Sequence, residues 1–213
     1  MNIAVLASHE GTTLQAVLDA CSDGGIAARV VIVISNNAGS GALRRARAAG
    51  VQALHLSSIT HPGPNALDRA LSQTLADHGV ELVLLAGYMK KLGPLTLASF
   101  AGRILNTHPA LLPRFGGQGL YGSHVHRAVL AAGERESGAT LHGVDAEYDT
   151  GPAIAQIKVP VEVTDTPDTL AARVQAAERT QLVRVLAEIA SGARPWPMPS
   201  GSVRGPRAAR ARP

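Results

Sequence analysis

Short apolar runs alternate with amphipathic stretches through residues 1–108, and this alternation narrows the choice of fold more than any other feature. Continuous apolar runs are typical of parallel strands buried on both faces. Between them, apolar residues recur at the spacing of helices. Strand and helix in repeated succession predict an α/β domain with right-handed crossovers. We therefore expect one doubly wound, mostly parallel sheet with helices on both faces.

The expected elements fit one domain over residues 1–194. Residues 138–145 and 152–159 look like a pair of strands that closes the sheet with an antiparallel, hairpin-like edge. Residues 195–213 are rich in Pro and Arg, which predicts a basic, disordered tail. Other strands are expected over residues 2–7, 29–34, 51–56, 80–85 and 103–108, and helices over 14–21, 41–49, 65–78, 93–100, 125–132 and 169–189.

Charge and composition exclude several classes of protein. The net charge is +4, and the four arginines after residue 194 account for all of it. A neutral folded part argues against a nucleic-acid-binding domain, which normally shows a basic face. No apolar run is long enough to span a membrane, and we expect no signal peptide before the first strand. The single cysteine, Cys21, is interpreted as core filler, and a cytoplasmic location is expected.

Asn106 and His108 end the expected strand 103–108, immediately before Pro109. Side chains two apart on a strand share one face, so the carboxamide and the imidazole point together beyond the strand. In open parallel sheets that crevice binds ligands. The alternative is a polar pair that only hydrogen-bonds the next loop. That loop, residues 109–123, is long and rich in Gly and Pro, as functional lids often are.

A second polar loop, residues 8–13, joins the first strand to the first helix. Gly11 allows close approach of the backbone, Thr12 and Thr13 add hydroxyl groups, and a helix N-terminus attracts anions. The loop is neither GxGxxG nor a P-loop. Taken alone, an ordinary turn with a Thr N-cap is the favoured interpretation.

Several sequence stretches together resemble a known family. They are Asn2-Ile-Ala-Val-Leu, Thr13-Leu-Gln-Ala, Leu85-Ala-Gly-Tyr-Met, Leu105-Asn-Thr-His-Pro-Ala-Leu-Leu-Pro, Gly138-Ala-Thr-Leu-His, Asp149-Thr-Gly-Pro and Arg173-Val-Gln. The chain resembles the folate-dependent formyltransferases over residues 1–192, and among them the phosphoribosylglycinamide formyltransferase family. The resemblance implies the Rossmann-like formyltransferase fold.

The resemblance also implies roles for individual residues. Asn106, His108 and Asp149 match the family's catalytic residues. His142 aligns with a family histidine near the site and receives no role. Gly11, Thr12 and Thr13 match the loop that holds the substrate phosphate, while Met89, Lys90, Lys91 and Leu92, together with Asn106, match the residues that bind the formyl folate.

The implied reaction is formyl transfer from 10-formyltetrahydrofolate to the glycyl amine of glycinamide ribonucleotide in purine (IMP) biosynthesis. Asn106 and His108 would stabilise the oxyanion of a tetrahedral intermediate, and His108 would also move protons. A nearby Asp149 carboxylate would raise the pKa of His108. The expected partners are these two small molecules, without nucleic acid or membrane, and a homodimer stays open.

Some residues depart from the family pattern. His9 and Glu10 stand in the phosphate loop, where Glu10 should point outward to avoid repelling a phosphate. Pro64 stands where the family often has a basic residue. His124 and His126 have the spacing of a metal pair, but a solvated junction between loop and helix is favoured, and no metal site is expected.

Three rival functions follow from the same motifs. Methionyl-tRNA formyltransferase would need a further C-terminal domain and a basic face. A formyltetrahydrofolate hydrolase typically has an additional N-terminal domain. A binding module without catalysis would not need Asn106, His108 and Asp149 together. Hydrolysis, or transfer to another amine acceptor, is kept as the alternative.

Overall fold

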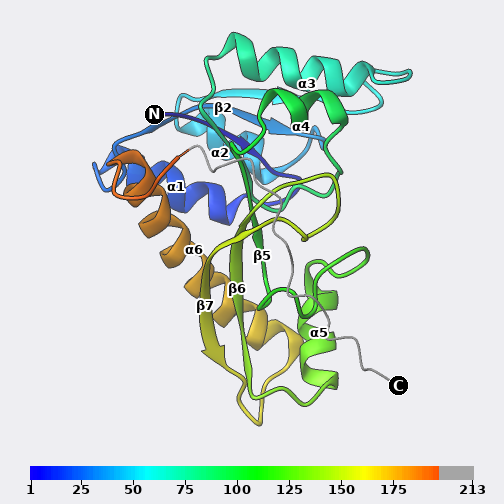
Figure 1. Ribbon diagram of the computed structural model, residues 1–213, viewed down its shortest axis with the longest axis vertical. Helices are drawn as coiled ribbons and strands as arrows, with labels where there is room; N and C mark the ends of the chain where they lie inside the picture. Colours follow the sequence, from blue (N-terminus) through cyan, green and yellow to red (C-terminus); the bar gives the residue numbers. More distant parts are fainter. Residues whose placement is uncertain (197–213) are drawn as a thin grey trace, which may run out of the picture.

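The computed structural model describes residues 1–196, and within that range the chain forms one seven-stranded sheet and six helices (Figure 1). The strands are β1 (Asn2–Leu6), β2 (Arg29–Ser35), β3 (Gln52–His55), β4 (Leu82–Leu85), β5 (Ile104–His108), β6 (Glu136–Gly143) and β7 (Ala153–Pro160). The helices are α1 (Thr12–Ser22), α2 (Gly41–Ala48), α3 (Ala66–Asp77), α4 (Pro94–Ser99), α5 (Ser123–Ala131) and α6 (Pro167–Ala190).

The strand order is β3-β2-β1-β4-β5-β6-β7. Pairs from β3 through β5 are parallel, whereas β5–β6 and β6–β7 are antiparallel. The predicted α/β sheet with an antiparallel edge is therefore confirmed. At most of the helix and strand ends, the observed bounds differ from the expected ones by a few residues. These ends are where the sequence pattern is least informative.

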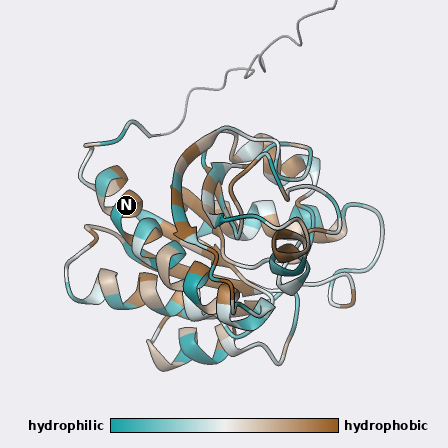
Figure 2. Cartoon of the chain, turned by 90° about the horizontal axis from the view of Figure 1, so that it is seen from below, coloured by the Kyte–Doolittle hydropathy of each residue, from teal (hydrophilic) through white to brown (hydrophobic). Residues whose placement is uncertain are grey.

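Two hydrophobic clusters cover the two faces of the sheet. Alternate residues of β1 divide between them, with Ile3 and Val5 on one side and Ala4 and Leu6 on the other, as the two-residue period of a strand requires. Helices α1, α2 and α6 pack on the first face, and α3 and α4 pack on the second. Figure 2 shows hydrophobic strands in the interior, between helices along which hydrophilic and hydrophobic residues alternate.

A third cluster extends the core below the parallel part of the sheet. Val125 and Val129 of α5 pack with Ala139 of β6, Val159 of β7 and the first turns of α6. This cluster anchors α5 and the loop before it against the antiparallel strands (Figure 1). The loop that follows His108 is thereby held at both of its ends.

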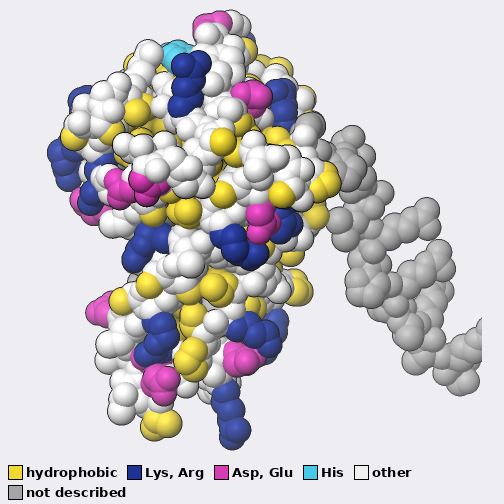
Figure 3. All heavy atoms as spheres, turned by 90° about the vertical axis from the view of Figure 1, so that its left-hand side faces the viewer, with side chains coloured by type: hydrophobic (Ala, Val, Ile, Leu, Met, Phe, Trp, Pro, Cys, Tyr) yellow, Lys and Arg dark blue, Asp and Glu magenta, His cyan; other side chains and the backbone are white. Residues whose placement is uncertain are grey.

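The surface carries charges of both signs. On the face shown in Figure 3, basic and acidic side chains lie interspersed. Among the described residues, no helix is long and apolar enough to cross a membrane. Cys21 is partly buried against the first cluster, where burial raises the pKa of its thiol. Most of the predicted tail, residues 197–213, lies outside the described residues.

Asp68 on α3 joins that helix to α4. Its carboxylate accepts hydrogen bonds from the Leu95 and Thr96 backbone N–H groups, at 2.8 and 3.0 Å, and from the Thr96 hydroxyl at 2.6 Å. Asp68 is only 7% exposed. Because it satisfies the free N–H groups at the start of α4, it acts as a cap from a neighbouring helix.

We expect Asp68→Ala to lower the free energy of unfolding by about 1–3 kcal/mol, because buried donors lose their acceptor. Urea unfolding measures this change. Asp77→Ala is the matched control on the same helix, since Asp77 is exposed and its side chain, within residues 1–196, accepts from Gln73 alone, one turn earlier. Equal losses in the two variants would contradict the capping role.

Candidate active site

Asn106 and His108 lie at the carboxyl end of β5, as the sequence predicts. His108 is 4% exposed and Asn106 is half-buried. The Nε2 atom of His108 lies 2.8 Å from the carbonyl oxygen of Phe115, in the loop that follows β5. A carbonyl can only accept, so Nε2 carries a proton and donates to this loop.

Asp149 reaches the same place from the turn between β6 and β7. Its Oδ2 atom lies 3.4 Å from Nδ1 of His108 and accepts from the Gly117 N–H at 2.9 Å. The backbone at Asp149 has φ 58, a left-handed conformation that Asp adopts more readily than most residues. A Cβ at Gly151 would collide with the Gly143 carbonyl, so the Asp-Thr-Gly-Pro turn requires glycine there.

His142 is a site residue to which sequence analysis assigned no role. The register of β6 places it directly opposite Asn106. Its Nδ1 atom lies 2.7 Å from the Gly143 carbonyl and its Nε2 atom lies 3.0 Å from Nδ2 of Asn106. Nδ1 therefore holds the proton of the neutral ring, and Nε2 accepts from the carboxamide. Oδ1 of Asp149 lies 3.5 Å from the same Nε2.

Two opposing effects set the protonation of His108. Burial lowers its pKa, as does His142, whereas the Asp149 carboxylate and the Phe115 carbonyl raise it, and the net pKa lies below the ordinary value. The direction expected for Asp149 is confirmed. The net pKa is nevertheless low, because removing the ring from water costs more than the carboxylate returns.

The Asp149 carboxyl remains ionised in this environment. Burial raises its pKa, but the adjacent His142 and His108 rings and the hydrogen bond from the Gly117 N–H together outweigh burial. The net pKa lies below the ordinary value. A largely buried carboxylate thus lies beside His108 and favours the charged state of that ring.

The loop of Gly11 lies at the carboxyl end of β1. Gly11 has φ 71, and a Cβ there would lie 2.8 Å from Cα of Ala42, so the loop packs directly on α2. Among the described residues, α1 begins without a side-chain cap and without an acidic residue in its first turn. The expected Thr N-cap is therefore wrong, and the helix start is available to an anion.

Glu10 points away from this helix start. Its carboxylate is 71% exposed and lies 3.3 Å from the guanidinium of Arg44 on α2. The expectation that Glu10 points outward is confirmed. The acidic residue in the loop is thus paired with a cation on α2.

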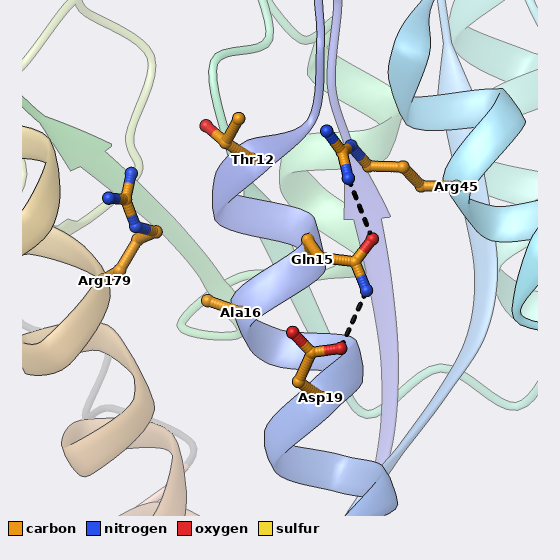
Figure 4. A pocket seen from close by; sticks show the side chains of 6 residues that line it. All are labelled: Thr12, Gln15, Ala16, Asp19, Arg45 and Arg179. Atoms are coloured by element: carbon orange, nitrogen blue, oxygen red, sulfur yellow. Dashed lines mark hydrogen bonds between the residues drawn. The ribbon is translucent and has the colours of Figure 1, made fainter.

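A pocket of about 320 Å³ borders the first two turns of α1. Arg45 of α2 and Arg179 of α6 approach it from opposite sides of α1 (Figure 4). Arg45 donates to the Glu10 carbonyl at 2.8 Å and to Oε1 of Gln15 at 3.1 Å. Arg45 therefore holds the loop of Gly11 through the Glu10 carbonyl and brings positive charge close to that loop. The pocket is lined by Thr12, Gln15, Ala16, Asp19, Arg45 and Arg179.

Glu178 of α6 is a second residue that sequence analysis did not single out. It is 8% exposed and accepts from the Thr13 hydroxyl at 3.1 Å. Burial raises its pKa, and hydroxyl groups of Thr13 and Thr107 offset part of the rise. The sequence did carry a signal for Glu178. This acidic residue lies on the apolar stripe of the helix, one turn after Val174 and one turn before Leu182.

The segment Met89–Leu92 follows β4 and faces the turn of Asp149. Lys91 lies 3.6 Å from the carboxylate of Glu147 and 5.4 Å from the ring centre of Tyr148. Met89 is 36% exposed, while Leu92 is buried. Pro64 is exposed in the loop that precedes α3. The structure therefore brings the predicted folate segment and the turn of Asp149 together.

His124 and His126 do not form a pair. His124 is exposed, whereas His126 is 2% exposed and its Nδ1 atom has no partner among the described residues. The interpretation as a solvated junction is thus wrong for His126, which packs inward from α5. Among residues 1–196, no group of three His, Cys, Asp or Glu side chains is arranged to hold a metal ion.

Comparisons with known proteins agree with this geometry. The family model described as Formyl transferase matches residues 1–186. Phosphoribosylglycinamide formyltransferase of Escherichia coli is 40% identical over 192 residues, which cover 90% of this chain and 88% of that protein. The crystal structure of glycinamide ribonucleotide transformylase 1 from Symbiobacterium toebii has a TM-score of 0.84 and 43% identity, covering 90% of this chain and 88% of that one.

The chain also matches part of a longer protein. The trifunctional purine biosynthetic protein adenosine-3 of Drosophila pseudoobscura is 42% identical over 193 residues, covering 90% of this chain and 14% of that protein. The resemblance noted from the sequence is confirmed. The chain belongs to the formyl transferase family, and within it to the phosphoribosylglycinamide formyltransferases.

Proposed function

We propose that the chain transfers a formyl group from 10-formyltetrahydrofolate to the glycyl amine of glycinamide ribonucleotide. The observation that carries the proposal is the cluster of Asn106, His108 and Asp149, whose side chains converge from β5 and from the β6–β7 turn. The names of the relatives support the choice of acceptor. The roles of individual residues are part of the proposal.

The two substrates would approach this cluster from different sides. Gly11, Thr12 and Thr13 offer a helix start without a cap, which suits the phosphate of a ribonucleotide. Met89–Leu92 offers a partly exposed apolar side chain for a pterin ring, and the cationic Lys90 and Lys91 suit the carboxylates of a folate. Asn106 and His108 lie between these regions, where the reacting atoms would meet.

The chemistry requires charge stabilisation and one net proton movement. When the amine attacks the formyl carbon, negative charge develops on the formyl oxygen and positive charge on the attacking nitrogen. Donors from Asn106 and His108 would stabilise the oxygen. The amine loses one proton and the leaving folate nitrogen gains one, and His108 would relay it. Asp149 would stabilise the imidazolium, which burial otherwise disfavours.

Direct transfer between the two bound molecules needs no covalent enzyme intermediate. Holding both substrates in reach supplies much of the rate enhancement. The cytoplasmic location, the use of a small-molecule acceptor without further partners, and a homodimer stay predictions.

An assay with a 10-formyl folate tests the function. We expect turnover only when glycinamide ribonucleotide is present, and a loss of about 10²–10⁴-fold in His108→Ala through missing proton transfer and oxyanion stabilisation. Spectrophotometry of the folate product measures both. Formate release without the acceptor would indicate a hydrolase, and near-normal turnover of His108→Ala would remove His108 from the mechanism.

We expect Asp149→Asn to lower the pKa of His108 further, because the carboxylate is the principal group that favours the charged ring. The charged form of His108 would then appear only at more acidic pH than in the wild type. An NMR titration of the imidazole measures the shift. An unchanged or raised pKa would contradict the pairing of these two residues.

We expect Gly11→Ala to raise the KM for the ribonucleotide about 10-fold, since a Cβ at φ 71 is strained and strikes α2. The KM for the folate should stay unchanged. Gly24→Ala is the control, because Gly24 also has positive φ but no atom within 4 Å of the added Cβ. Steady-state kinetics with each substrate varied in turn measures both KM values. An equal change in the two would contradict the assignment of the Gly11 loop to phosphate binding.

A further inference from the structure

Ser8 lies at the carboxyl end of β1 and has no role in the site described so far. It is 3% exposed. Its backbone N–H donates to the Gly87 carbonyl at 3.1 Å, and its hydroxyl oxygen accepts from the Met89 N–H at 2.8 Å. Ser8 therefore holds the stretch after β4 at two points.

The direction of these hydrogen bonds is determined by their partners. The Met89 N–H can only donate, so Oγ of Ser8 accepts there and its own proton points elsewhere. That proton goes to Oδ1 of Asn36, at 2.5 Å. The backbone carbonyl oxygen of Asn36 lies 3.3 Å from Nε2 of His55. A chain of polar contacts thus runs across the carboxyl ends of β3, β2, β1 and β4.

These polar contacts cross the point where the strand order of the sheet reverses. From β1 the polypeptide proceeds outward to β2 and β3, and it then returns to β4 on the other side of β1. Ligands bind in the crevice at such a point. Gly87, at φ 70, bends the backbone after β4 so that Met89 comes back toward Ser8.

We propose that Ser8 is a positioning residue for the formyl donor, because its hydroxyl fixes the start of the Met89–Leu92 segment. This inference rests on the proposed function, which places the folate at that segment. Among residues 1–196, the Ser8 hydroxyl is the acceptor found for the Met89 N–H. Asn36 acts one step further away, since it orients the hydroxyl so that a lone pair faces Met89.

The acceptor substrate should be independent of this contact. The Gly11 loop is held from the other side by the backbone contact between His9 and Ala42 and by Arg45. Loss of the Ser8 hydroxyl would therefore loosen the donor segment and leave the proposed phosphate loop in place. This separation distinguishes positioning of the donor from general damage to the fold.

The test compares Ser8→Ala, Asn36→Ala and the double variant in the full chain. Calorimetry with 10-formylfolate measures donor affinity, and steady-state kinetics measures both KM values. We expect Ser8→Ala to weaken donor binding about 5- to 30-fold, because a buried N–H loses its acceptor, with the KM for the ribonucleotide unchanged. Asn36→Ala should weaken it in the same direction, and should add nothing further once Ser8 is Ala.

Ser40→Ala is the matched control. Ser40 is also 3% exposed and accepts from a backbone N–H, that of Leu43 at 3.3 Å, but it caps α2. It should lower the melting temperature without changing donor affinity. The same loss of donor affinity in Ser40→Ala, or unchanged affinity in Ser8→Ala, would overturn the proposal.

Failure of the proposed function would be seen separately. A wild-type chain that binds 10-formylfolate but does not formylate the ribonucleotide would overturn the acceptor and leave Ser8 to be judged by donor binding alone. A wild-type chain that does not bind the folate would overturn both. If Ser8→Ala does not fold, Asn36→Ala decides, and additive effects of the two substitutions in a folded double variant would contradict the chain of contacts.

Discussion

The antiparallel pairing of β5 with β6 is the interaction on which the site depends. Its register sets His142 opposite Asn106 and Thr140 opposite His108. Thr140 then accepts from the Leu112 N–H and donates to the Ala110 carbonyl, which holds the start of the loop over the site. Since side chains alternate along a strand, a shift of one residue would turn all of these groups to the wrong face. The parallel part of the sheet supplies the crevice, and the pairing of β5 with β6 positions the polar side chains in it.

Within that frame, His108 balances burial against charge. Both ring nitrogens face acceptors, the Phe115 carbonyl and the Asp149 carboxylate, which only a doubly protonated ring satisfies. Burial favours the neutral ring and prevails in the described structure. A ring in this position is ready to take a proton when further negative charge arises beside it, as in an oxyanion.

Much of this arrangement could be predicted from the sequence. Apolar runs and helical spacing located the strands and helices, and the Pro109 boundary located Asn106 and His108 at a strand end. The sequence did not reveal which strand would lie beside β5, so the contact of His142 with Asn106 was missed. Nor does local pattern measure burial at a distance, so the sequence did not reveal that burial lowers the net pKa of His108 or that His126 is buried. Glu178 was missed because its partner, Thr13, lies 165 residues away along the chain.

Glu81 contacts both ends of the described chain. Its carboxylate accepts from the Asn2 N–H at 2.7 Å, and its carbonyl accepts from the Trp196 indole at 3.4 Å. Both ends of the described residues thus lie at the amino ends of the strands. Asn106 and His108 lie at the opposite, carboxyl ends. When the two ends of a folded domain lie together and away from a ligand site, fusion, insertion and circular permutation are tolerated. The same fold could therefore be joined to other modules without disturbing its crevice, and the much longer Drosophila relative contains a matching segment of this kind.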